Sequence, residues 1–174
     1  MVLLWSKTVD QALAEVRFTH RYEFEISTEP RTLDNTDEII PRYAAVKQHI
    51  VVILNSHFPH WMGRRFRLKH WLQRKKHDEL AYFLNEAGSN CLAYADHKIP
   101  AQFRLWIGKK GFLIGITQSG GGFPAREVYV QKRRNNLGGG FRFYARCRSK
   151  IFFDSPAKAT EVYLLWKKPM FFKR

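Results

Sequence analysis

The chain has little cysteine. Cys91 and Cys147 are its two cysteines, and they lie far apart and match no metal-binding spacing. We therefore expect reduced thiols in the core and a cytoplasmic location. No apolar run is long enough to cross a membrane, because the longest, around residues 50–54, has polar neighbours on both sides. The first residues have neither a cationic segment nor a small-residue cleavage site, which argues against a signal peptide.

What the chain does have is apolar residues and positive charge. Its 174 residues are 45% apolar and 15% aromatic, which is typical of one folded domain with a real core. The net charge is +15, and it is unevenly distributed. Residues 1–40 carry four basic and eight acidic residues, whereas residues 41–174 carry 26 basic and seven acidic ones. Such a field favours polyanionic partners: nucleotides, nucleic acid, an acidic protein or an anionic membrane surface.

The order of apolar patterns predicts an α+β fold. We expect a two-layer α/β sandwich, with a mixed, mainly antiparallel sheet and helices on one face. A helical period predicts helices at residues 2–18, 40–56, 78–94 and 141–150. Alternation and turn signals predict strands at residues 21–27, 101–107, 111–117, 150–154 and 160–166.

Residues 57–77 are unusually basic, with seven Lys or Arg, four His and no acid. Aromatic residues between cations suit the stacking and phosphate contacts of single-stranded nucleic acid. Alternatively, the segment is an amphipathic helix whose Trp61, Phe66 and Trp71 enter the core. We favour the second interpretation for the aromatic residues and leave the charges open. Binding to a membrane surface is a third alternative.

Three patches carry potential chemistry. Glu86 and Asn90 are four residues apart on a predicted helix, so a carboxylate and an amide share one face and could hold a divalent ion. Glycines at 120–122 follow a predicted strand, and glycines at 138–140 lead directly into a predicted helix. The first triplet lets a backbone approach a ligand closely, and the second suits a phosphate. Alone, the pair of Glu86 and Asn90 is better explained by a solvated helix edge, and a single glycine triplet is weak evidence against a flexible loop or an ordinary turn. The three patches in this order favour a nucleotide pocket.

In this order the patches resemble the motifs of GHKL (Bergerat-fold) ATP-binding domains, and in particular those of the small anti-sigma-factor serine kinases. Residues 86–90, EAGSN, resemble the helix signature E-A-x-x-N, and residues 118–123, QSGGGF, are similar to D-x-G-x-G-F. Residues 138–141, GGGF, are similar to the second glycine motif, which opens a helix. The resemblance covers residues 20–168. It leaves residues 1–19 as a helical extension, 57–77 as a basic insertion and 169–174 as a basic tail.

The resemblance implies a role for each matched residue. Asn90 would coordinate Mg²⁺, and Glu86 would be the general base. Residues 124–137 would form a lid, although a solvated loop explains its charges equally well. The other residues implied to bind ATP are Gln118, Gly120 and Gly122 for the adenine and ribose, Gly138, Gly139 and Gly140 for the phosphates, and Lys132, Arg133 and Arg134 in the lid.

The implied function is a stand-alone regulatory domain that binds Mg-ATP and switches a protein partner. An active form would be a serine/threonine kinase or an ATPase, and the family implies a homodimer. The family has an Asp where this chain has Gln118, whose side-chain oxygen can also accept a hydrogen bond but carries no charge. The alternative is therefore a catalytically inactive, basic module on the same fold that binds nucleic acid or an acidic protein.

Overall fold

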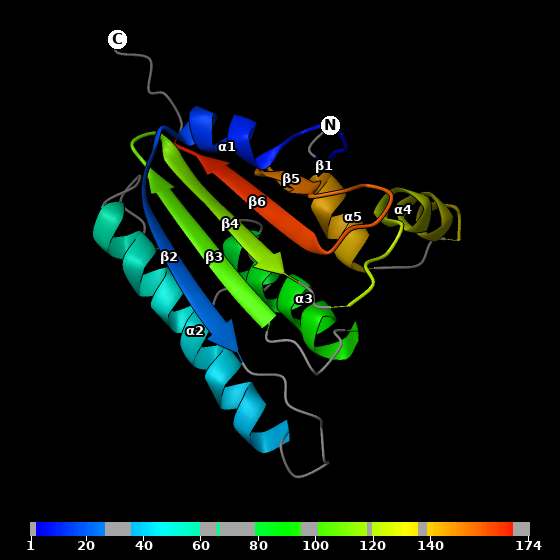
Figure 1. The fold of residues 1–174 in the computed structure, drawn as a ribbon, viewed down its shortest axis with the longest axis horizontal. Coiled ribbons are helices and arrows are strands. Elements are labelled where there is room, and N and C mark those ends of the chain that lie inside the picture. The colour runs from blue at the N-terminus through cyan, green and yellow to red at the C-terminus, as the bar shows by residue number, and fades with distance from the viewer. Residues whose placement is uncertain are drawn as a thin grey trace.

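The computed structural model describes residues 3–26, 36–59, 66, 79–94, 101–117, 120–135 and 139–168. The fold combines helices with one six-stranded sheet (Figure 1). The strands are β1 (Leu3–Leu4), β2 (Phe18–Ile26), β3 (Ala101–Gly108), β4 (Gly111–Thr117), β5 (Lys150–Phe153) and β6 (Glu161–Lys167). The helices are α1 (Val9–Val16), α2 (Thr36–His57), α3 (Glu79–Tyr94), α4 (Ala125–Arg134) and α5 (Gly139–Arg146).

The sheet has the strand order β1-β5-β6-β4-β3-β2. The pair β1 and β5 is parallel, and the other neighbours are antiparallel. A mixed, mainly antiparallel sheet is thereby confirmed, and with it the predicted α+β class. Within the described residues, no helix is long and apolar enough to cross a membrane.

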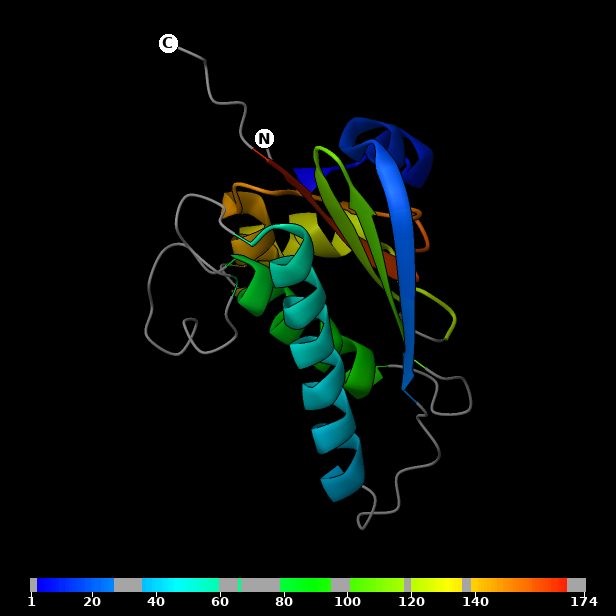
Figure 2. The ribbon, with the colours of Figure 1, turned by 90° about the vertical axis from the view of Figure 1, so that its left-hand side faces the viewer.

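Side chains of successive strand residues point to opposite faces, and both faces of the sheet are covered. On β3, Phe103, Leu105 and Ile107 pack into the larger core, under α2 and α3. Trp106 points the other way, into a smaller core that it shares with residues of α1. Figure 2 shows α2 and α3 on one side of the sheet and α1 on the other. The helices of the predicted domain thus share a face, while the helix of the N-terminal segment adds cover to the second face.

The N-terminal segment differs from its prediction. Helix α1 begins only at Val9, because residues 3–4 pair with β5 instead of continuing a helix. A capping box sets this start: the Thr8 side chain accepts a hydrogen bond from the Gln11 N–H, and the Gln11 side chain accepts one from the Thr8 N–H. The first strand of the prediction also begins earlier than expected, at Phe18.

Of the basic segment 57–77, the structure describes only residues 57–59 and Phe66. The Phe66 ring packs edge-on against Phe112 and Trp166, with ring centroids 5.6 and 5.7 Å apart. The side-chain amide of Asn55 holds the Phe66 backbone with hydrogen bonds of 2.8 and 3.0 Å. Phe66 therefore packs on the core, as predicted, but it is not part of a helix. Trp61 and Trp71 lie outside the described residues.

Candidate functional site

The structure brings together two parts of the predicted site, Glu86 on α3 and Gly140 in the first turn of α5. Gly140 is buried, and a Cβ added to it would overlap with Oε1 of Glu86. The carboxylate therefore lies directly on the amino end of α5, where backbone N–H groups lack partners within the helix and the helix dipole is positive. Residues more than 50 positions apart in the sequence thus form one polar site.

Aromatic contacts hold α3 against α5 at this site. Tyr82 stacks on Phe143 with ring centroids 4.0 Å apart, and Phe83 lies 6.1 Å from Tyr144. Burial raises the pKa of the Tyr144 hydroxyl well above its usual value, and the nearby charge of Glu86 raises it further. The same two causes raise the pKa of Tyr82. Both tyrosines therefore stay neutral beside the carboxylate.

The opposite side of α3 is fixed to α2. A Cβ added to Gly88 would overlap with the hydroxyl of Tyr43, and that hydroxyl donates a hydrogen bond to the Leu84 carbonyl. Lys47 Nζ donates to Asn85 Oδ1 at 2.6 Å. This close packing orients α3 about its axis. Residues 85 and 88 face α2, while Glu86 faces α5.

Asn90 lies one helical turn after Glu86 on α3 and is half-buried. This places the predicted carboxylate and amide on neighbouring turns, as their spacing requires. Within the described residues, no group of three or more His, Cys, Asp or Glu side chains could hold a metal ion. A magnesium site at Asn90 would thus depend on oxygens of the nucleotide, which is how Mg²⁺ is commonly held.

The first glycine segment is an exposed loop attached to the β5–β6 turn. Gly120 and Gly122 have φ angles of 126° and 74°, which favour glycine, and Gly121 has no atom within 4 Å of an added Cβ. The loop is secured just beyond them, where Phe123 and Ala159 exchange backbone hydrogen bonds of 3.0 and 2.8 Å. Gln118 and Ser119 lie outside the described residues, as does Gly138 of the second segment.

The predicted lid contains a helix, α4, that was not predicted. Glu127 lies in its first turn and the cations at 132–134 in its last, an arrangement that complements the helix dipole. This charge order was the sequence signal that could have identified the helix. Lys132, Arg133 and Arg134 are exposed, and α4 packs on α5 through Tyr129 and Phe141, whose rings lie 5.7 Å apart. Helix α4, which carries the cations of the predicted lid, therefore contacts α5, but these cations lie on the side of α4 that faces solvent.

A polar cluster on the sheet was not predicted. Glu161 is buried, pairs with Arg104 at 3.1 Å and accepts a hydrogen bond of 2.6 Å from the Tyr163 hydroxyl. Burial raises the pKa of Glu161, although Tyr163 and Arg104 oppose the rise. Gly115 makes the space for it, because an added Cβ would lie 2.6 Å from Glu161 Oε1. No local pattern marks this pairing, because the residues come from three different strands.

Comparisons with known proteins give no independent assignment: no family model matches the chain, and a search of curated proteins finds no match.

Proposed function

We propose that this chain is a stand-alone ATP-binding regulatory domain of the GHKL type, which binds Mg-ATP and acts on a protein partner as a serine/threonine kinase or as a partner-switching protein. The observation that carries the proposal is the contact between Glu86 and the first turn of α5. The resemblance implies this contact, because it places the carboxylate of the helix signature at 86–90 beside the helix that the second glycine motif at 138–141 opens. The order of helix, hairpin, glycine loop and second glycine-led helix supports the same reading.

The described residues fit such a ligand at the phosphate end. Gly140 leaves room beside the first turn of α5 for the Glu86 carboxylate, so phosphate oxygens would approach the N–H groups of this turn from another side. Bound Mg²⁺ would neutralise phosphate charge and orient the terminal phosphoryl group. Asn90 would hold the metal, and Glu86 would accept the proton of a Ser or Thr hydroxyl of the partner. The lid cations would stabilise the charge if α4 moved over the nucleotide.

The remaining features of the proposal follow from the same reading. The partner is a protein that presents the phosphoryl acceptor, and the domain acts in the cytoplasm, where the free and buried Cys147 stays reduced. Burial raises the pKa of this thiol, which keeps it unreactive. A homodimer is the assembly that the resemblance suggests.

The test is a thermal-shift panel of ATP, ADP and GTP, each with and without Mg²⁺. At a nucleotide concentration of about 100 times Kd, binding stabilises the native state by about 2.7 kcal/mol and raises Tm by about 5–10 °C. Asn90→Ala should abolish the magnesium-dependent part of this gain. Asn85→Ala is the matched control, because Asn85 is on the same helix but faces Lys47 of α2.

Two further results would decide the question. Glu86→Gln should keep the thermal shift and lose phosphoryl transfer, because it removes only the general base. The absence of a shift with every nucleotide in the presence of Mg²⁺ would refute the nucleotide site, and the inactive basic module would then be the better account.

A further inference from the structure

One end of the sheet gathers cations from separate parts of the sequence. We name this surface the basic end, and it comprises Arg17, Lys109, Lys110, Lys167 and Lys168, all exposed. Backbone hydrogen bonds hold its segments together. The N–H of Lys109 donates to the Arg17 carbonyl at 3.2 Å, and that of Lys110 donates to the Val16 carbonyl at 2.9 Å. Lys168 N–H donates to the Lys110 carbonyl at 2.8 Å. The β3–β4 turn, the end of α1 and the end of β6 therefore form one rigid cationic surface.

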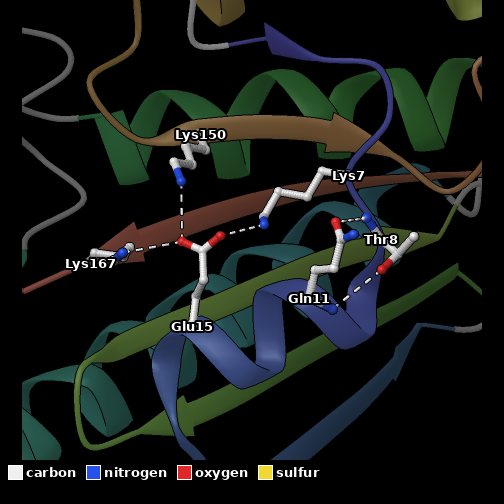
Figure 3. Close-up of polar contacts among 6 residues, drawn as sticks. All are labelled: Lys7, Thr8, Gln11, Glu15, Lys150 and Lys167. Carbon is white, nitrogen blue, oxygen red and sulfur yellow. Dashed lines mark hydrogen bonds and ion pairs between the residues drawn. The ribbon is translucent and has the colours of Figure 1, made fainter.

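A cluster of lysines around Glu15 lies beside the basic end. The Glu15 carboxylate contacts Lys7 at 2.5 Å, Lys150 at 3.1 Å and Lys167 at 3.2 Å (Figure 3). Since Lys167 already belongs to the basic end, the cluster adds two lysines and one carboxylate, an excess of one positive charge. The cluster thus orients Lys167 without neutralising the surface.

A β-bulge places an aromatic ring at the same end. Phe18 pairs with Gly108, whereas His20 pairs with Ile107, so Thr19 is an extra residue in β2. The Thr19 hydroxyl donates to the Ile107 carbonyl at 3.2 Å, which stabilises the bulge. In a regular strand, Phe18 would share the helix-covered face with His20, whose ring contacts His57 of α2. The bulge shifts this alternation by one residue, so Phe18 pairs with Gly108 on the face that carries α1, and 44% of its surface is exposed.

Arg17 occupies a backbone conformation that usually selects glycine. It ends α1 with φ 54°, in the left-handed region, and is the one non-glycine residue of the described chain with positive φ. An arginine at such a position is strained relative to glycine. Strain of this kind is often retained where a side chain has a function.

We propose that the basic end binds single-stranded nucleic acid, with its cations on the phosphates and the Phe18 ring stacked on one base. A cationic surface with an exposed aromatic ring is the combination by which single strands are bound without sequence preference. A duplex offers no free base face to Phe18. An acidic protein fits less well, because lysine is depleted at protein–protein interfaces and this surface is mostly lysine. The proposal does not depend on the nucleotide site.

The experiment measures fluorescence anisotropy of a labelled oligothymidine of about 12 nucleotides over a range of salt concentrations. Phe18→Ala should weaken binding by about 5- to 150-fold, the loss expected for one stacked base, and leave the salt dependence unchanged. Lys109→Glu with Lys110→Glu should weaken binding and lower the slope of log K against log salt by about 1.4. Phe18, Lys109 and Lys110 are all exposed, and the Tm of each variant will verify that it folds.

The matched control is the double charge reversal Arg126→Glu with Lys158→Glu. These exposed residues lie at the other end of the sheet, next to the β5–β6 turn. The seven residues of β6 separate the two ends by about 20 Å. This control changes the net charge by the same amount and should reduce binding much less than the reversal at the basic end.

Three results would overturn the proposal. Equal losses in the two charge-reversed proteins would indicate binding by overall charge rather than by this surface. Equal affinity for a duplex of the same length, with no effect of Phe18→Ala, would exclude base stacking. Competition by polyglutamate as strong as that by unlabelled oligothymidine would assign the surface to an acidic protein.

Discussion

The glycines of the three predicted patches have different roles in this protein. Gly88 lies within the helix signature, yet its lack of a side chain serves packing against Tyr43. Gly140 lies in the second glycine motif, and its lack of a side chain admits the Glu86 carboxylate. Gly121 has open space around it. The role of each glycine therefore follows from the atoms packed around it and not from the motif in which it occurs.

These surroundings predict effects of different size for the same substitution. Gly88→Ala should lower the free energy of unfolding by about 2–3 kcal/mol, because Tyr43 is buried and cannot move away freely. Gly121→Ala should change it by less than about 0.5 kcal/mol. Urea denaturation measures both. A Gly88→Ala protein as stable as the parent would show that α2 and α3 are not packed as described.

At the scale of elements, the two ends of helix α1 differ: its start has the capping residues that local sequence favours, and its end has a strained arginine. Its start has a complete capping box, the expected N-terminal solution. Its end lacks the usual glycine, and Arg17 takes the left-handed position instead. The C-terminus of α1 also abuts Gly108 of β3, where an added Cβ would overlap with the Val16 carbonyl. The helix is therefore tightly packed at the end where the residue that follows it, Arg17, is strained.

Arg17→Gly should consequently stabilise the protein by about 1 kcal/mol, because it relieves the left-handed conformation. It should also weaken oligothymidine binding, because it removes a cation from the basic end. Thermal unfolding and anisotropy on the same sample test the two effects together. Arg17→Lys is the control: it keeps both the strain and the charge, so it should change neither quantity much.

At the scale of the whole molecule, Glu15 joins the two ends of the chain. Its lysine partners come from the segment before α1, from β5 and from β6. Burial alone would raise the pKa of Glu15, but the hydrogen bonds from Lys7, Lys150 and Lys167 lower it from 4.5 to about 2. The charged form is therefore favoured in the folded state.

This pKa predicts a pH dependence with a defined sign. A depressed carboxyl pKa stabilises the fold above the unfolded value of 4.5, and the contribution is lost as the pH falls to about 2. Glu15→Gln should cost about 1–2 kcal/mol at pH 7, and the difference from the parent should vanish near the lower limit. Urea denaturation across this pH range measures it. Glu25→Gln, at an exposed position of β2, is the control that removes one negative charge and leaves the Glu15 contacts intact.

Much of the fold was determined by local sequence. Strands 101–107 and 111–117 were predicted nearly as they occur, because alternation and a turn signal are short-range properties. The same holds for the amphipathic helix that carries Glu86 and Asn90. The two residues of β1 could not be predicted, because their state depends on a partner strand almost 150 positions later. Helix α4 was missed because glycine and proline around it suggested a loop.

The sequence by itself determined which residues could carry chemistry: the spacing of Glu86 and Asn90 and the place of the second glycine triplet before a helix. Only the tertiary structure decided which of them meet. It set Glu86 on the first turn of α5, left the lid cations on the solvent side of α4, and assembled the basic end from α1 and two strand ends. The physical reason is that helix periodicity and turn chemistry act over a few residues. Contacts between elements depend instead on strand order and on which faces pack, and no local pattern encodes these.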